Sequence, residues 1–178
     1  MLNVFKPILR IQEKEIIKSI KKMSKLRDEI SSENFNGKNT ALNLAKWMPN
    51  IPIVYYPFGL QAAAVRFKNS LQENAKLHVI SEDIIEASHN GIVAWDNSKN
   101  FKPILIRGQN DFSKTKERWE IIKEFFDERN IEYKEIFTLP GNIVTKIVNL
   151  IYFFDYVSIY TAGLRKIDPT PTYPIKFI

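Results

Sequence analysis

The stretch Ile51-Pro52-Ile53-Val54-Tyr55-Tyr56 is an unbroken run of apolar, β-branched and aromatic residues. It lacks the alternation of polar and apolar side chains that half-exposed strands show. It therefore predicts a strand that is buried on both faces, as in a parallel sheet. The turn Pro57-Phe58-Gly59 follows, and the alanine-rich segment 60–74 predicts a helix. A strand that leads through a turn into a helix is the basic unit of a parallel α/β fold.

The same order of elements recurs along the rest of the chain. Short apolar runs predict three further strands, at 77–80, 102–107 and 131–137. Apolar residues at helical spacing predict helices at 9–31, 41–48, 113–129 and from 143 onward, with Thr40 as the N-cap of the second of these helices. The alternation predicts an α/β domain: a three-layer αβα sandwich in which helices flank a parallel sheet. Such sheets bind ligands at the carboxyl ends of their strands.

Composition narrows the possible chemistry. A length of 178 residues is typical of one domain. The chain has no cysteine, which excludes disulfides, thiolate catalysis and zinc fingers. The two histidines, His78 and His89, do not have the spacing of a metal site, so we expect no metal. The sequence contains neither Gly-x-Gly-x-x-Gly nor a Walker loop, and we expect no cofactor.

The net charge of +6 favours anionic partners. The densest basic run, 18–27, carries apolar residues at helical spacing and predicts the solvated face of an amphipathic helix. A phosphorylated small molecule is therefore a better candidate partner than a nucleic acid. The apolar segment 143–164 contains Lys146, Asn149 and Asp155, which are costly in lipid, so it predicts a buried helix. The start of the chain does not resemble a signal peptide. We expect a cytoplasmic protein without a membrane partner.

Two short polar segments bear a potential base and a potential acid. Gln72-Glu73-Asn74-Ala75-Lys76 contains the carboxylate of Glu73, and Glu86-Ala87-Ser88-His89-Asn90 contains the imidazole of His89. Taken alone, a glutamate near a helix end is usually solvated, and a histidine before Asn-Gly is usually a turn residue. The two segments gain meaning from the stretches around them.

Five stretches together resemble the C-terminal half of the bifunctional phosphoglucose/phosphomannose isomerase family. They are Asn39 to Ala45, Ala63 to Lys76, Ser88 to Trp95, Asp155-Tyr156-Val157-Ser158, and Asp168-Pro169-Thr170-Pro171-Thr172 with Pro174-Ile175. The resemblance implies two sugar-isomerase (SIS) domains, each an αβα sandwich around a five-stranded parallel sheet. Residues 37–178 correspond to the second domain, and residues 1–36 to a linker helix and loop.

The resemblance also implies a function. The family interconverts glucose 6-phosphate or mannose 6-phosphate with fructose 6-phosphate, by a proton transfer through an enediol that needs no metal. Glu73 matches the proton-shuttling glutamate, and partial burial would raise its pKa toward neutral pH. His89 matches the ring-opening histidine, which acts in the neighbouring subunit, so the resemblance implies a homodimer.

Three further positions are candidates for contacts with the substrate. Thr172 matches the threonine that leaves room for either C2 epimer, with Thr170 as the alternative. Arg66 either binds the substrate or pairs with an acidic residue. The family's C-terminal lysine would fall just past Ile178, and Lys176 is out of register for that role.

The first SIS domain of the family supplies a Ser/Thr-rich phosphate pocket and an arginine at the active site, and we find no counterpart of either in this sequence. Two readings follow. The chain is an isomerase module that works with an N-terminal SIS domain, or it is a sugar-phosphate-binding module without catalysis. A basic nucleic-acid binder, whose affinity would fall steeply with salt, is a distant third reading.

Overall fold

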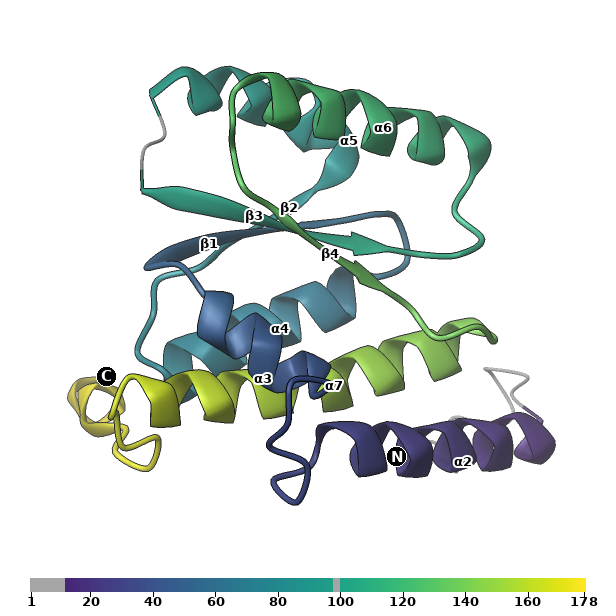
Figure 1. The fold of residues 1–178 in the computed structure, drawn as a ribbon, viewed down its shortest axis with the longest axis vertical. Helices are drawn as coiled ribbons and strands as arrows, with labels where there is room; N and C mark the ends of the chain where they lie inside the picture. The colour runs from purple at the N-terminus through teal and green to yellow at the C-terminus, as the bar shows by residue number, and fades with distance from the viewer. Residues whose placement is uncertain (1–11, 98–99) are drawn as a thin grey trace.

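Four parallel strands form the single sheet, in the order β2-β1-β3-β4 (Figure 1). The computed structural model describes residues 12–97 and 100–178. The strands are β1 (Ile51–Tyr56), β2 (Ile80–Asp83), β3 (Phe101–Arg107) and β4 (Lys134–Phe137). The expected parallel α/β sandwich is confirmed. The described residues contribute four strands, one fewer than the family resemblance implies.

The central strand β1 is buried on both faces, which explains its lack of polar residues. Val54 and Tyr56 belong to one hydrophobic core, whereas Ile53 and Tyr55 belong to the core on the opposite face. In the registers, Ile53 lies opposite Ile80 of β2, and Val54 lies opposite Ile104 of β3. Alternate residues therefore serve two separate cores, as a sheet covered on both sides requires.

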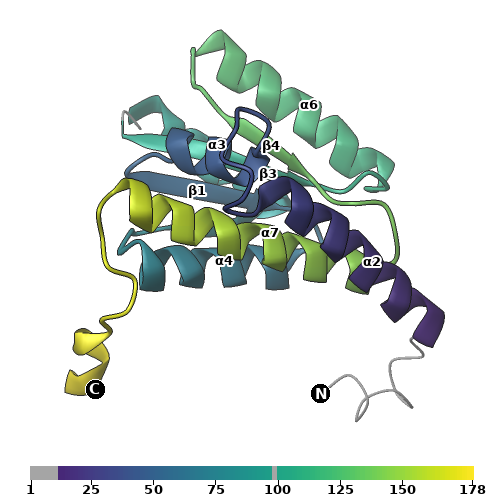
Figure 2. The ribbon, with the colours of Figure 1, turned by 60° about the horizontal axis from the view of Figure 1, so that its bottom comes forward.

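Helices cover both faces of the sheet. The helices are α2 (Glu13–Ile30), α3 (Thr40–Trp47), α4 (Gln61–Asn74), α5 (Ile84–Ala87), α6 (Ser113–Glu128) and α7 (Ile143–Leu164), with 3₁₀ helices η1 (Gly91–Asn97) and η2 (Tyr173–Phe177). α5 and α6 lie on one face, and α3, α4 and α7 on the other (Figure 1). α2 packs on α7, farther from the sheet, as the turned view confirms (Figure 2).

The second strand begins later than expected. The sequence predicts it at 77–80, but β2 runs from Ile80 to Asp83. Lys76 has φ +54°, and the Leu77 amide donates to the Leu71 carbonyl, so these residues finish the end of α4. The prediction was wrong because the polar residues Glu82 and Asp83 follow an apolar run. They nevertheless pair with Tyr55 and Tyr56 of β1.

Three other local predictions need correction. Asn39, and not Thr40, caps α3, because its side chain accepts a hydrogen bond from the Leu42 amide. The fourth strand is confined to 134–137, the last part of the predicted 131–137. The helix predicted at 113–129 ends one residue earlier, at Glu128. The first predicted helix begins at residue 9, and residues 9–11 lie outside the described range.

α7 is the central helix on the face of the sheet that α3 and α4 also cover. Among the described residues it is the one helix long and apolar enough to cross a membrane. It packs instead against α2, α3 and α4. Its buried side chains include the polar residues Thr145, Asn149, Ser158 and Thr161 as well as Phe153 and Phe154. These contacts place α7 within the protein core.

Candidate active site

Glu73 and Thr172, far apart in the sequence, line the same groove. Its volume is about 640 Å³. One wall is the last part of α4. The other is the C-terminal tail, residues 169–178, which follows α7. The lining residues are Asn69, Gln72, Glu73 and Lys76 from the end of α4, with Pro171 to Ile175 from the tail. The structure therefore brings together two of the residues that the sequence nominates for the substrate site.

The groove lies at the edge of the sheet opposite to the one expected. α4 starts after the carboxyl end of β1 and returns the chain to the start of β2, so Glu73 lies near the amino ends of the strands. Figure 1 shows the C-terminal tail at the left, whereas the strand arrows of β3 and β4 point right. The general rule of ligand binding at the carboxyl edge does not describe where Glu73 and Thr172 meet.

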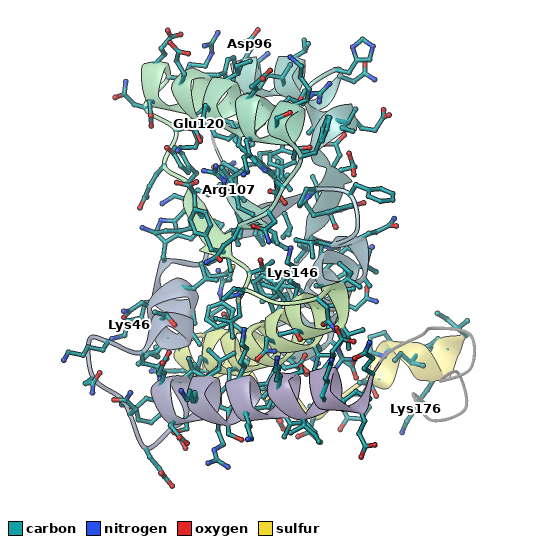
Figure 3. The ribbon with its side chains drawn as sticks, turned by 90° about the vertical axis from the view of Figure 1, so that its right-hand side faces the viewer. Lys46, Asp96, Arg107, Glu120, Lys146 and Lys176 are labelled. Atoms are coloured by element: carbon teal, nitrogen blue, oxygen red, sulfur yellow. The ribbon has the colours of Figure 1, made fainter. Side chains whose placement is uncertain are left out.

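The carboxyl edge does hold a hollow of about 220 Å³, between the turns that follow β1 and β3. One of its backbone donors is already occupied. The Gly108 amide donates to Asp111 Oδ2 at 2.9 Å, and Trp119 Nε1 donates to the same oxygen at 3.2 Å. The protein's own carboxylate therefore takes the place that a bound anion would need. Lys146 of α7 also lines this hollow (Figure 3).

The position of Glu73 is set by polar contacts between α4 and α7. Asn74 Nδ2 donates to Ser158 Oγ at 2.9 Å, and Ser158 Oγ donates to the Asp155 carbonyl at 2.8 Å. Ser70 Oγ donates to Asp155 Oδ1 at 3.0 Å. Ser158 is fully buried and Ser70 nearly so. The stretch Asp155 to Ser158, which carries part of the family resemblance, thus anchors the helix that presents Glu73.

The Glu73 side chain is exposed. Its carboxylate forms no ion pair or hydrogen bond with the residues that the structure describes. The partial burial expected for this glutamate is therefore absent in the isolated chain. A second protein surface over the groove would be needed to bury the carboxylate.

Arg66 lies outside the groove. Its guanidinium pairs with Asp155 of α7, with Nε 3.3 Å from Oδ1. Both side chains are partly exposed, so the pair stabilises the fold little. The sequence leaves two roles open for Arg66, substrate binding and pairing with an acidic residue. The structure shows the ion pair with Asp155.

The two candidate threonines of the tail differ in burial and in their position relative to the groove. Thr172 is half-buried and lines the groove. Thr170 is exposed, and its amide donates to Asp168 Oδ1 at 2.9 Å, which lowers the pKa of the Asp168 carboxyl. Lys176 lies beside the Tyr173 ring, 5.5 Å from its centroid, on a segment that projects from the body (Figure 3). It does not line the groove.

His89 lies on the other side of the sheet from Glu73. It is exposed in the turn after α5, and its amide donates to the Glu86 carbonyl at 2.9 Å. α5 packs in the core with α6, whereas α4 packs in the opposite core. Within one chain, the sheet therefore separates the predicted acid from the predicted base.

The turn that carries His89 is tightly supported. A Cβ on Gly91 would approach Glu82 Oε2 to 2.8 Å, so the start of η1 lies directly against the Glu82 carboxylate of β2. Burial, followed by repulsion from Glu86 and Asp83, raises the pKa of the Glu82 carboxyl. Farther along, Trp95 Nε1 donates to the buried Tyr55 hydroxyl at 3.0 Å. Burial raises the pKa of Tyr55 to about 12.

Sequence reasoning missed several residues that shape the groove. Lys76, Asn74 and Ser158 lie within the stretches that resemble the family, but the sequence predicts no role for them. The sequence alone could not show that Asn74 contacts Ser158, because the two residues lie on different helices. Their presence in two stretches of the same family resemblance was the available signal.

The fold defines a class of protein. A glucose-6-phosphate isomerase-like protein from Thermus thermophilus superposes with a TM-score of 0.71 at 18% identity, over 88% of this chain and 54% of that one. A glucosamine-6-phosphate deaminase from Thermotoga maritima superposes with a TM-score of 0.65 at 9% identity, over 96% of this chain and 51% of that one. The chain therefore has the fold of the sugar-phosphate enzymes built from SIS domains.

Sequence comparison identifies the family. Residues 37–178 match the family described as bacterial phospho-glucose isomerase C-terminal SIS domain, and the chain belongs to it. A bifunctional phosphoglucose/phosphomannose isomerase from Caldicellulosiruptor bescii is 28% identical over all of this chain and 54% of that protein. One from Aquifex aeolicus is 24% identical over 86% of this chain and 48% of that protein. The chain spans about half the length of these curated relatives.

Proposed function

We propose that this chain is the C-terminal module of an aldose–ketose isomerase that interconverts glucose 6-phosphate or mannose 6-phosphate with fructose 6-phosphate. The observation that carries the proposal is the groove that Glu73 and Thr172 both line. Family membership supports the same substrate class. In this proposal residues 1–36 form the linker, and residues 37–178 form the catalytic module of a cytoplasmic enzyme.

Glu73 performs the central proton transfer. In the open-chain sugar its carboxylate takes the proton from C2 of the aldose, and a cis-enediolate forms with its negative charge on O1. The same carboxyl group then returns the proton to C1 on the same face, while the hydroxyl proton on O2 passes to O1, which gives the ketose. Atoms balance without a metal or a redox partner. Thr172, opposite Glu73, borders the space for the C2 substituent and accommodates either epimer.

The phosphate of the substrate must be held by a surface outside this chain. Lys76 is the one cationic residue among those that line the groove, and its ammonium group already donates to backbone carbonyls. We infer that an N-terminal SIS domain covers the groove, binds the phosphate and buries the Glu73 carboxylate. Burial would raise the pKa of this carboxylate into the range useful for proton transfer.

His89 opens the sugar ring from a second copy of the chain. Because the sheet separates His89 from Glu73 within one chain, the site is incomplete without this copy. Exposed apolar side chains surround the His89 turn: Ile85 is 47% exposed, Val93 67% and Ile121 64%. We propose that this face, formed by α5, η1 and α6, contacts the second subunit.

The test is the conversion of fructose 6-phosphate to glucose 6-phosphate by the purified chain, alone and with a separately made N-terminal half. We expect activity only in the mixture. Glu73→Gln should lower kcat by at least about 100-fold, because a general base is lost. Glu33→Gln is the matched control, since Glu33 is exposed in the loop before α3, away from the groove.

One outcome favours the second candidate function. If the two halves associate and bind the sugar phosphate but show no turnover, the chain is a binding module without catalysis. One observation favours this candidate: the Glu73 carboxylate is exposed and pairs with none of the residues that the structure describes. Full turnover by Glu73→Gln would reject the proposed mechanism.

A further inference from the structure

Lys76 joins the two walls of the groove. Its Nζ donates to the Glu73 carbonyl at 2.5 Å on the α4 side, and to the Pro171 carbonyl at 2.7 Å and the Pro169 carbonyl at 3.5 Å on the tail side. Glu73 and Thr172 each lie next to an atom that this ammonium group contacts. The contact therefore joins the backbone of Glu73 on one wall to the residue before Thr172 on the other.

The tail has few other attachments. Its side chains from Tyr173 onward are exposed, with Tyr173 at 64%, Ile175 at 65% and Phe177 at 91%. Among residues 12–97 and 100–178, Lys76 is the one side chain that forms hydrogen bonds to segment 169–178 from outside it, apart from the neighbouring Asp168, which accepts from the Thr170 amide. Apolar burial is therefore too small to fix this segment, and the ammonium contacts become decisive.

The proline content of the tail makes these carbonyls suitable acceptors. Pro169 and Pro171 have no amide hydrogen and keep φ near the extended range, so the segment cannot satisfy its own carbonyls as a helix would. An ammonium group carries three donors without a fixed plane. It can therefore serve one carbonyl from α4 and two from an extended chain.

The backbone of Lys76 determines which substitution is suitable for a test. Its φ is +54°, in the left-handed region where glycine is favoured and other residues are strained. Glycine or asparagine is the usual residue at such a helix end. Replacement of Lys76 by glycine therefore removes the ammonium group without adding backbone strain.

We propose that Lys76 is a positioning residue, whose ammonium group holds segment 169–172 against the end of α4 and so sets Thr172 opposite Glu73. This inference deepens the proposed isomerase function and rests on it for its catalytic part. The structural part, the tethering of the tail, can be measured without any activity.

Lys166 provides a matched control. It also follows a helix, α7, and also has a positive φ, of +56°. Its exposed side chain makes no hydrogen bond or ion pair with the described residues. Lys76→Gly and Lys166→Gly therefore remove the same charge and relieve the same backbone strain. Only the first change removes contacts with the tail.

The first measurement is amide hydrogen exchange of segment 169–178 in the purified chain. We expect Lys76→Gly to speed exchange in this segment about tenfold, equivalent to about 1.4 kcal/mol, and Lys166→Gly to leave it unchanged. Lys76→Arg keeps donors at this position and should restore much of the protection. Equal exchange in Lys76→Gly and Lys166→Gly would overturn the proposal, as would a rate unchanged from the unsubstituted chain.

The second measurement uses the complete enzyme or the reconstituted halves. We expect Lys76→Gly to raise KM for fructose 6-phosphate by about tenfold and to change the ratio of glucose to mannose product, with partial rescue by Lys76→Arg. If the tail loosens while KM and the product ratio stay unchanged, Thr172 is not positioned by Lys76 and the catalytic part is wrong. If the unsubstituted enzyme has no isomerase activity, the proposed function fails, and hydrogen exchange still decides whether Lys76 tethers the tail.

Discussion

The buried side chain of Asn39 closes the loop between α2 and α3. Its Nδ2 donates to the carbonyls of Ile30, Ser31 and Asn34, at 3.0, 3.3 and 3.1 Å, and its Oδ1 accepts from the Leu42 amide. Asn39 has no exposed surface. One side chain therefore satisfies backbone groups at the end of one helix and the start of the next.

Substitution of Asn39 tests this assignment. Asn39→Ala should lower the free energy of unfolding by roughly 2–4 kcal/mol, because it leaves buried backbone groups without partners. Thr40→Ala is the control, since the sequence pattern favours Thr40 as the cap and its side chain is exposed. Its cost should stay below about 0.5 kcal/mol. Urea unfolding of the purified chain measures both values, and a larger loss in Thr40→Ala would contradict the structure.

At the scale of elements, the pairing of α4 with α7 determines where the groove forms. The apolar part of the contact is the stack of Phe67 on Phe154, both fully buried, with ring centroids 4.0 Å apart. The polar part is the set of bonds from Ser70 and Asn74 to α7. The apolar stack stabilises the pair, and the directional polar contacts fix the position of the last turn that bears Glu73.

A double-mutant cycle tests the polar contact between the two helices. Asn74→Ala and Ser158→Ala should each cost about 1–2 kcal/mol in the free energy of unfolding, because each leaves a partner unpaired. The double variant should cost less than the sum of the two, with a coupling of roughly 0.5–1.5 kcal/mol. Additive costs, measured by urea unfolding, would show that the hydrogen bond between Asn74 and Ser158 contributes nothing.

At the scale of the whole molecule, the sheet separates the two proposed catalytic residues. Glu73 lies in α4 on one face and His89 follows α5 on the other, so no side-chain movement within a chain brings them together. The proposed site must combine Glu73 from one copy with His89 from another. An oligomer with twofold symmetry would contain two such sites.

Mixed subunits test this arrangement. Glu73→Gln and His89→Gln, each in the complete enzyme, should be nearly inactive when prepared separately. Coexpression with random pairing should restore about a quarter of the unsubstituted activity, because half of the dimers are mixed and each mixed dimer has one intact site. A failure to regain activity, with mixed dimers confirmed by mass spectrometry, would show that both residues act within one chain, whereas an active His89→Gln variant would show that His89 has no role.

Much of the fold could be predicted from the sequence because its signals are local. The unbroken apolar run at β1 indicates burial on both faces, and the spacing of Trp119, Ile122 and Phe126 indicates the inward side of α6. The beginning of β2 could not be found in the same way. Its polar residues Glu82 and Asp83 are in the sheet because β1 pairs with them, which is a tertiary contact.

The sequence by itself determined the family, the parallel α/β architecture and the candidates Glu73, His89 and Thr172, because these depend on residue types and their order along the chain. The tertiary structure decided that Glu73 meets Thr172 at the amino edge of the sheet, that His89 lies across the sheet from both, and that Arg66 pairs with Asp155. The reason is physical. Local sequence specifies which face of an element is apolar, whereas packing of that face against others specifies which polar side chains become neighbours.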